Sequence, residues 1–389
     1  MLAALFWLGI IWTIYAYVGF PVLVTVLARF RRGGKGAVPV DATLPVTIVI
    51  PAYNEERNIE MRIRNAREAD YPDQLLEVMV VSDASTDRTN EIVRGFGSSG
   101  VRLIEQETRR GKTAGLNRAV ETAHGEVIVF TDANAAYAPD TITNLVRHFA
   151  DPSVGLVSGY TKYTRTDTGT VAEATNAYTS LEKAIKKAES HWGGCVGADG
   201  AIFAMRRALY RPLRDDDIND FVLPLDVIEQ GYKCLFDEES FCSENPGKNL
   251  ESEFRRQSRI TNRSLRAIWR RTRLLNPVRF PAFAFFLFSH KVVRFLAPVF
   301  LFLSGLSLVM LAPQEPLYSL LAAVTLLTLV VVTVAQMWPR LVPSGLSGSR
   351  PVRMLNVFAL MNLAMLHGWW KFLSGNPEIT WQHDRALSR

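Results

Sequence analysis

The stretch VTIVIPAYNEERNI, residues 46–59, decides the fold of this chain. Its first half is short, apolar and rich in β-branched residues, which is typical of a strand buried on both faces. We expect this strand to run from Pro45 to Ile50 and to stop at Pro51. Helical spacing follows from Glu55 to Ala69. A strand that leads into a helix predicts the first unit of a parallel sheet.

Three further units repeat this scheme at intervals of about 25 residues. Their strands are Glu77 to Val81, Val101 to Glu105 and Glu126 to Phe130, and their helices begin after Thr86, Lys112 and Pro139. Alternating strands and helices predict an α/β domain with a mostly parallel sheet covered on both faces.

Polar residues follow the predicted strands directly. Because parallel sheets bind ligands beyond the carboxyl ends of their strands, these residues are the candidates for a site. They are Asn54, Glu55, Asp83, Lys112, Asp132 and Asn134, and four of these six are charged. The first loop contains no G-x-G-x-x-G, which disfavours a dinucleotide cofactor and leaves a mononucleotide held by carboxylates and carbonyls.

Some of these residues have a plainer interpretation. Asp83, Ser85 and Asp87 are residue types that cap helices, and for Asp87 this role stays open. Asp83 follows its strand almost directly and lies before the expected cap, which favours the site. For Lys112 the alternative is a solvated lysine at a helix start.

Both ends of the chain are strongly apolar. Leu2 to Leu27 carries no charge, is long enough to span a bilayer, and is followed by basic residues, which favours an uncleaved anchor over a signal peptide. Three further runs approach spanning length, namely Phe295 to Ala312, Leu317 to Trp338 and Met354 to Leu373.

Basic residues gather in three segments beside these runs, namely Arg29 to Lys35, Arg263 to Arg294 and Arg340 to Arg353. Four spans place these segments on one side, and the positive-inside rule then puts the large domain in the cytosol and both termini on the far side. The net charge of +6 therefore reflects topology and anionic lipid, and we expect no nucleic-acid partner. Three cysteines lack metal spacing and are expected to be buried: Cys195, Cys234 and Cys242.

Seven strings in order resemble the family 2 glycosyltransferases, which adopt the GT-A nucleotide-sugar-binding fold. They are VTIVIPAYNEERNI, VVSDASTDRT, RRGKTAGLNRA, FTDANAAYAPD, GADGAIFAMRR, INDFVLPLDVIEQGY and FRRQSRITNRSL. The flanking apolar runs resemble the polysaccharide-synthase-like branch, so the resemblance implies a membrane-bound hexosyltransferase.

The resemblance also implies roles for individual residues. Asp83, with Glu55 and the backbone near Ala52, is implied to recognise uridine, because a carboxylate accepts the imide proton and ribose hydroxyls. The donor is then a UDP-sugar. Lys112 is implied to donate to the nucleotide or its phosphates.

FTDAN occupies the place of the family's D-x-D motif, whose two acids hold a divalent ion against the pyrophosphate. Asp132 is the expected residue for the metal and ribose region. Asn134 replaces the second acid and is an expected Mg²⁺ or Mn²⁺ ligand through its amide oxygen, which brings no negative charge.

INDFVLPLDVIEQGY resembles the segment that supplies the general base, which implies Asp220. Asp215, Asp216 and Asp217 lie just upstream, and the alternative for them is a solvated acidic loop. In GADGAIFAMRR, Asp199 and Gly200 are expected at the sugar or acceptor, with Gly197 also allowing close approach; a plain turn is the alternative.

FRRQSRITNR corresponds to the segment that carries Q-x-x-R-W in processive synthases, and this sequence lacks that pattern. Arg256 and Arg259, with Arg255, are expected at the diphosphate. The alternative is a basic helix face on anionic lipid, which fits a second set better: Arg263, Arg266, Arg270 and Arg271.

The predicted organisation is a transmembrane helix (1–28), a basic linker (29–44), a cytosolic GT-A domain (45–260), interfacial amphipathic helices (261–292), three transmembrane helices (293–374) and a tail (375–389). The expected function is inverting transfer from a nucleotide sugar to a polysaccharide or lipid-linked acceptor at the cell membrane, in exopolysaccharide or envelope glycan assembly. Single transfer to a lipid is the alternative, and an inactive transferase domain on a transporter or scaffold is a distant one.

Overall fold

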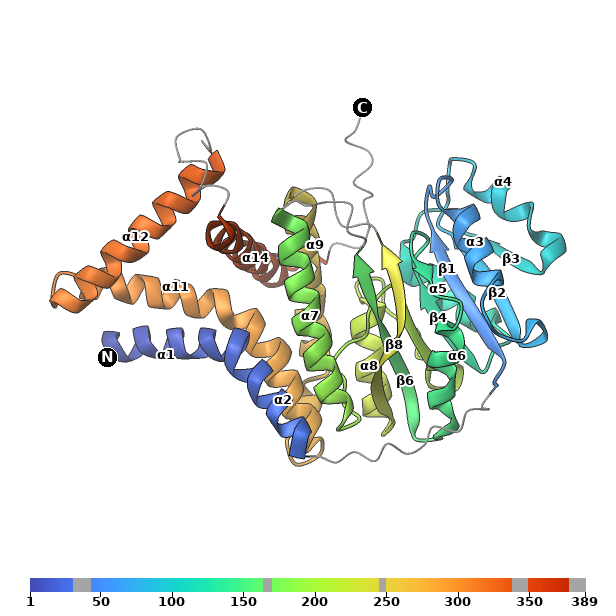
Figure 1. Ribbon diagram of the computed structural model, residues 1–389, viewed down its shortest axis with the longest axis horizontal. Coiled ribbons are helices and arrows are strands. Elements are labelled where there is room, and N and C mark those ends of the chain that lie inside the picture. Colours follow the sequence, from blue (N-terminus) through green and yellow to red (C-terminus); the bar gives the residue numbers. More distant parts are fainter. Residues whose placement is uncertain (31–42, 164–169, 245–249, 338–348, 378–389) are drawn as a thin grey trace.

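A computed structural model describes residues 1–30, 43–163, 170–244, 250–337 and 349–377 (Figure 1). Its centre is one eight-stranded sheet in the order β3-β2-β1-β4-β7-β6-β8-β5. The strands are β1 (Val46–Ala52), β2 (Leu76–Ser82), β3 (Val101–Glu105), β4 (Val127–Thr131), β5 (Ala136–Tyr137), β6 (Val154–Tyr163), β7 (Ile202–Arg206) and β8 (Lys233–Glu244).

The first half of the sheet confirms the four predicted strand and helix units. β1 pairs in parallel with β2 and β4, and β2 with β3. The helices that follow these strands are α3 (Ile59–Arg67), α4 (Thr89–Arg94), α5 (Lys112–Thr122) and α6 (Thr141–Val146). β1 continues through Pro51 to Ala52, so the strand ends two residues later than the sequence predicts.

The second half of the sheet contains the antiparallel pairs. β7 runs antiparallel to both β4 and β6, and β5 antiparallel to β8, whereas β6 and β8 are parallel. With four parallel and three antiparallel pairings, the sheet is the mixed α/β sheet of the GT-A fold with a parallel majority.

Two apolar cores lie on the two faces of the sheet. Ile48 and Val80 point into one core, together with α3 and α6. Val49 and Met79 point into the other, together with α5 and α8 (Asn219–Glu229). Adjacent strand residues enter opposite cores because side chains alternate across a strand, which is why these strands read as continuous apolar runs.

The second core continues into the apolar ends of the chain. It includes Phe20 and Val24 of α2 (Phe20–Phe30), and Phe283 of α10 (Pro281–Phe286). The remaining helices of this region are α1 (Leu2–Ile14), α7 (Thr170–Ser190), α9 (Leu250–Arg270), α11 (Val293–Leu311), α12 (Pro316–Met337) and α14 (Arg350–Leu373). Two π-helical segments connect neighbouring helices: η1 (Tyr15–Gly19) connects α1 to α2, and η7 (Leu287–Val292) connects α10 to α11. Helices α2 and α10 are therefore packed onto the α/β domain.

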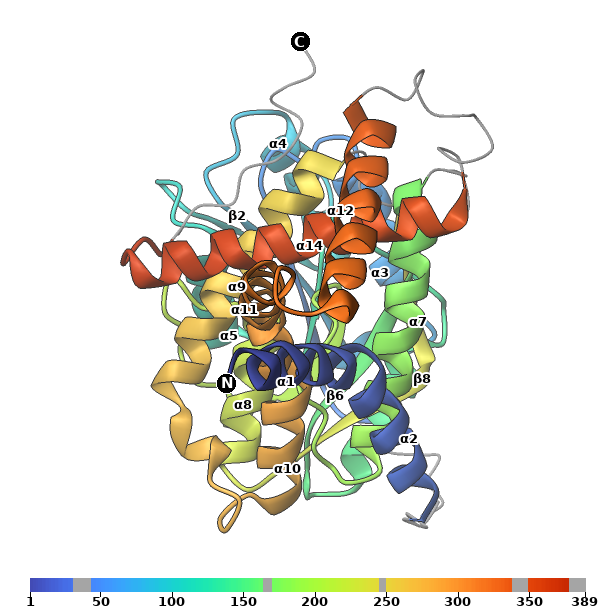
Figure 2. The ribbon, with the colours of Figure 1, turned by 90° about the vertical axis from the view of Figure 1, so that its left-hand side faces the viewer.

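Three helices of the described chain are long and apolar enough to cross a membrane: Leu2–Phe30, Pro281–Leu311 and Pro316–Ala335. The fourth predicted run, Met354 to Leu373, falls in α14 and is not among them. Asn356, Asn362, His367 and Lys371 lower its apolar character. α14 packs on α9 and crosses α11 at a steep angle, since each view that shows one of them lengthwise shows the other nearly end-on (Figures 1 and 2).

A buried ion-pair network joins α7 to the helix Pro281–Leu311. His290 Nδ1 lies 2.8 Å from Glu189 Oε1, and His290 Nε2 lies 3.0 Å from Glu182 Oε2. Arg294 also pairs with Glu182. Although burial raises the pKa of Glu182, Lys291, His290 and Arg294 together hold it well below its usual range. The catalytic domain is thus fastened to an apolar helix by charge as well as by packing.

The predicted linker and tail lie largely outside the described residues, at 31–42 and 378–389, as does Arg340. The predicted domain boundaries stay predictions.

Candidate active site

Asp83, which follows β2 directly, anchors the loop that leads to Lys112. Its Oδ1 accepts hydrogen bonds from Gln106 Nε2 (2.9 Å) and the Arg110 amide (2.8 Å), and its Oδ2 accepts one from the Gly111 amide (2.9 Å). Gly111 has a φ of 88°, a conformation that suits glycine. Asp83 therefore lies at the predicted edge of the sheet, and its contact with a nucleobase stays a prediction.

The loops after β1 and β2 are interlocked. The Asn54 amide donates to Ser85 Oγ (3.1 Å), and the Thr86 amide donates to Asn54 Oδ1 (2.8 Å). Asn54 and Ala84 both have positive φ, at 54° and 56°, which is a strained conformation for residues other than glycine. These contacts hold two of the four predicted loop tips in fixed relation.

Ala52 and Glu55, both expected at the nucleotide, have contacts within the protein. The Ala52 carbonyl accepts from the Asp83 amide (2.9 Å). Glu55 is buried, and its Oε2 accepts from Asn58 Nδ2 (2.7 Å) at the start of α3. Asp87 accepts from the Thr89 amide (3.0 Å), in line with the capping interpretation. Nucleotide contacts of Ala52 and Glu55 stay predictions.

Lys112 and Asp132 form an ion pair at the centre of the site. Lys112 is the first residue of α5, Asp132 follows β4, and their Nζ and Oδ1 atoms are 2.7 Å apart. Burial opposes the charge of the lysine, but Asp132, with Asp220 and Glu244, raises its pKa. Two of the residues predicted to bind the nucleotide are therefore in contact. Because Lys112 is paired with Asp132, the alternative of a solvated lysine at a helix start does not describe it.

Asp220 occupies the first turn of α8, and its carboxylate is in the same electrostatic field. Burial raises the pKa of Asp220, the positive charges of Lys112 and Lys186 oppose this, and Asp199 and Asp132 raise it further. Among the described residues, its buried Oδ1 has no hydrogen-bond partner. A carboxylate oxygen left unsatisfied in this way is available to accept a proton from a bound ligand.

The loop before β7 lies directly against this carboxylate. A β-carbon built on Gly200 would lie 2.7 Å from Asp220 Oδ2, so only glycine fits at this position without displacement. The Ala198 amide donates to the Asp220 carbonyl (2.7 Å), and Gly197 has a φ of 91°. Gly200 therefore makes a close approach to the candidate base, and the expected approach of Gly197 and Gly200 to a sugar or acceptor stays a prediction.

Asp199 holds this loop to β6. Its Oδ2 accepts from the Thr161 amide (2.9 Å), and its Oδ1 accepts from Thr161 Oγ1 (2.8 Å) and the Ala201 amide (3.2 Å). Both oxygens are thus engaged within the protein, which fits the turn interpretation. A contact between Asp199 and a sugar hydroxyl stays a prediction.

Asn134, the expected metal ligand beside Asp132, is exposed. Among the described residues, no three His, Cys, Asp or Glu side chains are grouped to hold a metal ion. This donor set fits Mg²⁺ or Mn²⁺ bound by one carboxylate and one amide oxygen, because such ions commonly take further ligands from substrate phosphates and water.

The arginines of α9 divide into two groups. Arg256 pairs with Glu253 (2.7 Å) and its charge acts on the pKa of Glu244, which places it beside the site; its role at a diphosphate, and that of Arg259, stay predictions. Arg270 instead pairs with Asp216 and Asp217. Asp216 and Asp217 are buried, so the interpretation of a solvated acidic loop is wrong for both of them.

Three charged residues of the site escaped the sequence analysis. Burial, with the charges of Asp132 and Asp199, raises the pKa of Glu244 to about 8. Lys186 of α7 acts on Asp220. Arg62 is fully buried, and its guanidinium carbon lies 4.2 Å from the centre of the Tyr137 ring, under the loop that carries Asp132. Glu244 lies at the end of β8 and Lys186 lies in α7. Both residues are far in sequence from the predicted site residues, so no local motif identifies them.

Comparisons with known proteins agree with this geometry. Residues 47–214 match the family model for glycosyl transferase family 2. Glycosyltransferase AglE of Haloferax volcanii is 29% identical over 144 residues, 36% of this chain and 47% of AglE. Beta-monoglucosyldiacylglycerol synthase of Nostoc sp. is 31% identical over 144 residues, 36% of this chain and 30% of the synthase. The chain thus matches less than half the length of these two relatives.

One solved structure is similar over nearly the whole chain. It is the mannosyltransferase PcManGT from Pyrobaculum calidifontis in complex with GDP-Man and Mn²⁺, with a TM-score of 0.73 and 25% sequence identity. The match covers 96% of this chain and 99% of the other, so it includes the apolar helices. With a match to the family 2 model over residues 47–214 and a GT-A fold, this chain is similar to the family 2 glycosyltransferases.

Proposed function

We propose that this protein transfers a sugar from a nucleoside diphosphate donor to a glycan or lipid-linked acceptor at the membrane surface, with inversion at the anomeric carbon. One observation carries the proposal. The carboxylate of Asp220, with a buried and unsatisfied oxygen, lies within electrostatic reach of the Lys112–Asp132 pair. This arrangement provides a proton acceptor, a cation suited to a diphosphate, and a carboxylate suited to the divalent ion that accompanies the diphosphate.

In this mechanism Lys112 binds the donor phosphates as a point charge, and Arg256 and Arg259 are positioned on α9 to add guanidinium contacts. Asp132 and Asn134 would hold a divalent ion, which offsets the charge that builds on the leaving diphosphate. PcManGT was solved with Mn²⁺, which supports this choice of ion. Asp83 fixes the loop on which Lys112 is carried.

Asp220 acts as the general base. As the acceptor hydroxyl attacks the anomeric carbon, its proton passes to the carboxylate, the new glycosidic bond forms, and the bond to the diphosphate oxygen breaks. A base with a pKa raised by burial is better matched to a hydroxyl proton than an ordinary aspartate. Gly200 keeps the space beside this carboxylate open.

The membrane arrangement that we propose has three spans. Arg294 is buried against Glu182 of the catalytic domain, so the part of Pro281–Leu311 before Phe295 lies with that domain and the bilayer begins beyond it. As the third span, α12 returns the chain to the side of the catalytic domain, where α14 packs on α9. α14 then lies on the cytosolic side, unlike the expectation from four spans.

Donor and acceptor classes are tested with one experiment. Membranes bearing the protein are incubated with labelled GDP-mannose and a panel of labelled UDP-sugars, each with Mn²⁺ or Mg²⁺. GDP-mannose is included because PcManGT binds it, and UDP-sugars because the sequence implies uridine. Organic-extractable product indicates single transfer to a lipid, which the missing Q-x-x-R-W favours; a long water-soluble chain indicates a synthase. No transfer from any donor contradicts the proposal.

Replacing Asn134 with aspartate is expected to lower the concentration of Mn²⁺ that gives half-maximal activity by roughly tenfold. The added carboxylate contributes a negative charge that the amide lacks, and the residue is exposed, so the fold tolerates the change. The measurement is initial rate against Mn²⁺ concentration. Asn134→Ala is the matched control and is expected to raise that concentration. An unchanged requirement in both variants would remove Asn134 from the metal site.

Replacing Gly200 with alanine is expected to reduce kcat by roughly 10² and to leave donor affinity nearly unchanged, since a displacement of about 1 Å at a reacting group has effects of this size. The new methyl group would meet Asp220 Oδ2 at 2.7 Å and push the carboxylate away. Steady-state kinetics with donor-binding measurements separate the two effects. Gly305→Ala, where a β-carbon meets nothing within 4 Å, is the control.

A further inference from the structure

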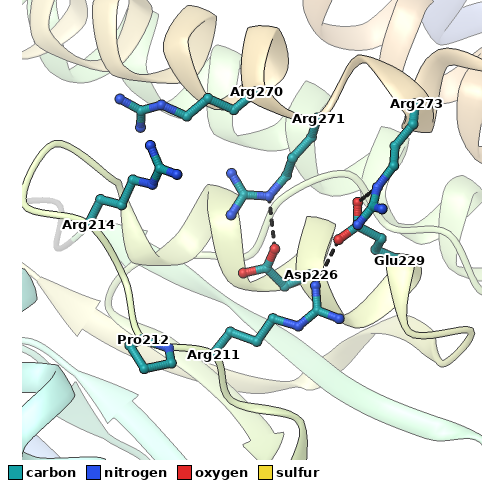
Figure 3. A pocket seen from close by; sticks show the side chains of 8 residues that line it. All are labelled: Arg211, Pro212, Arg214, Asp226, Glu229, Arg270, Arg271 and Arg273. Carbon is teal, nitrogen blue, oxygen red and sulfur yellow. Dashed lines mark hydrogen bonds and ion pairs between the residues drawn. The ribbon is translucent and has the colours of Figure 1, made fainter.

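A pocket lined by five arginines lies outside the candidate active site (Figure 3). Its volume is about 240 Å³, and its lining comes from the segment before α8, the end of α8, and the end of α9 with the turn after it. The lining residues are Arg211, Pro212, Arg214, Asp226, Glu229, Arg270, Arg271 and Arg273. Five guanidinium groups therefore share one small space with two carboxylates.

The two carboxylates engage three of these arginines. Arg271 Nε lies 2.8 Å from Asp226 Oδ1, Arg211 Nη1 lies 2.8 Å from Glu229 Oε2, and Arg273 also pairs with Glu229. Each guanidinium carries five N–H donors in a planar fork, so these contacts leave donors over. The pocket has donors and positive charge in excess of what its own acids satisfy.

Arg214 carries the excess. Within the described part of the chain, the Arg214 guanidinium has no hydrogen-bond or ion-pair partner, although the Arg214 amide donates to Asp217 Oδ2 (3.0 Å). Arg270 is held from its other side by Asp216 and Asp217. Figure 3 shows both guanidinium groups turned toward the same space. Asp216 and Asp217 already compensate the charge of Arg270, so the Arg214 guanidinium is the group that an anion in this space would pair with.

The pocket is separate from the donor site. Asp220 lies in the first turn of α8 and Glu229 is its last residue, so roughly 13 Å of helix separate them at about 1.5 Å per residue. In the chain, Arg273 precedes the helix Pro281–Leu311, of which the part beyond Arg294 is the proposed span. Trp269 and Val278, on either side of the arginines, are 73% and 90% exposed. Exposed apolar residues beside arginines are typical of a surface in contact with headgroups.

We propose that this pocket binds a phosphate-bearing anion, supplied by the headgroup of an anionic phospholipid or by free phosphate. A guanidinium fork matches the oxygens of a phosphate, and several forks converge here. The exposed Trp269 and Val278 beside the pocket offer apolar contacts to a lipid whose headgroup the arginines hold. This site is independent of the donor and of the chemistry at Asp220.

The test uses the full chain in neutral detergent, titrated with phosphatidylglycerol or phosphatidylcholine, with bound lipid counted by native mass spectrometry. Phosphatidylglycerol is expected to be retained about tenfold more than phosphatidylcholine, and Arg214→Gln to weaken that retention about fivefold. Arg64→Gln is the matched control, because Arg64 is exposed on α3, where its Nη2 lies 2.8 Å from Glu60 Oε1 in a surface ion pair. It removes the same charge and is expected to leave retention unchanged.

Inorganic phosphate is the second arm. If inorganic phosphate displaces phosphatidylglycerol, the site recognises the phosphate group alone. If it raises the thermal midpoint in an Arg214-dependent way while neither lipid is preferred, free phosphate is the ligand. Equal retention of both lipids by the wild-type protein, with no effect of phosphate, would overturn the proposal. Equal loss in the Arg214 and Arg64 variants would do the same, since it would indicate net charge instead of a site.

Discussion

Replacing Asp220 with asparagine is expected to lower the turnover number by about 10²–10⁴, the range over which a general base contributes. Asparagine keeps the shape of the side chain beside Gly200 but cannot take a proton. Donor binding should be nearly unchanged, because Lys112 and Asp132, the residues proposed to hold the phosphates and the divalent ion, are both retained. Single-turnover rates, with calorimetric titration of the nucleoside diphosphate, measure the two properties. Near-normal turnover in this variant would remove Asp220 from the mechanism.

A matched control for this experiment is Asp215→Asn. Asp215 lies in the same acidic segment and is exposed. Its loss removes the same charge at short distance in the sequence, and we expect turnover to stay within about twofold, as for other surface changes. A large loss in both variants would point to the charge of the segment instead of one base.

The pH profile gives a second readout of Asp220. Burial raises the pKa of this carboxyl, so the ionised base is lost as pH falls through a value above the ordinary aspartate pKa of about 3.9. Activity should therefore decline on the acid side earlier than an exposed aspartate would allow. The charge of Lys186 lowers this pKa, so Lys186→Met should move the acid limb to higher pH. An unmoved limb would contradict the electrostatic assignment.

Replacing His290 with alanine is expected to lower the free energy of unfolding by about 3–5 kcal/mol, as when one partner of a buried ion pair is removed. The side chains of His290 and Glu189 are 1% and 0% exposed, so the carboxylate would be left in a dry environment with only the Val196 amide on its other oxygen. The measurement is a denaturant titration of the protein in nanodiscs, followed by intrinsic fluorescence.

Two variants sharpen the His290 experiment. His124→Ala removes an imidazole whose side chain is 79% exposed and pairs with Glu77, and such surface pairs contribute about 0–1 kcal/mol. The double variant His290→Ala/Glu189→Gln removes the uncompensated charge and should recover part of the loss. If His290→Ala costs no more than His124→Ala, the network does not stabilise the junction.

Local sequence was sufficient for the first half of the catalytic domain. The β-branched runs and the helical spacing between them identify β1 to β4 with their helices, because each of these elements is decided by residues close together in the chain. β7 was different. Its placement between β4 and β6, antiparallel to both, depends on contacts between segments far apart in sequence, for which periodicity carries no signal.

The candidate site divides in the same way. Asp83, Lys112 and Asp132 lie directly after strand ends or a glycine turn, so position alone identified them, and the resemblance supplied Asp220. The sequence did not reveal that the carboxylate oxygens of Asp83 and Asp199 accept hydrogen bonds from the protein's own backbone amides. Glu244 and Lys186 were missed because only the folded chain brings them to Asp220 and Asp132.

The anchoring of α7 through Glu182 and Glu189 also limits how this enzyme meets its acceptor. A catalytic domain joined to the membrane helices by a flexible linker could change its distance from the bilayer as the product grows. Here His290 and Arg294 hold it to a helix that enters the bilayer in the arrangement proposed above, so under that proposal the fold fixes the distance between the candidate site and the lipid. Acceptors would then have to present their hydroxyl at that height, and longer products would have to leave the site sideways.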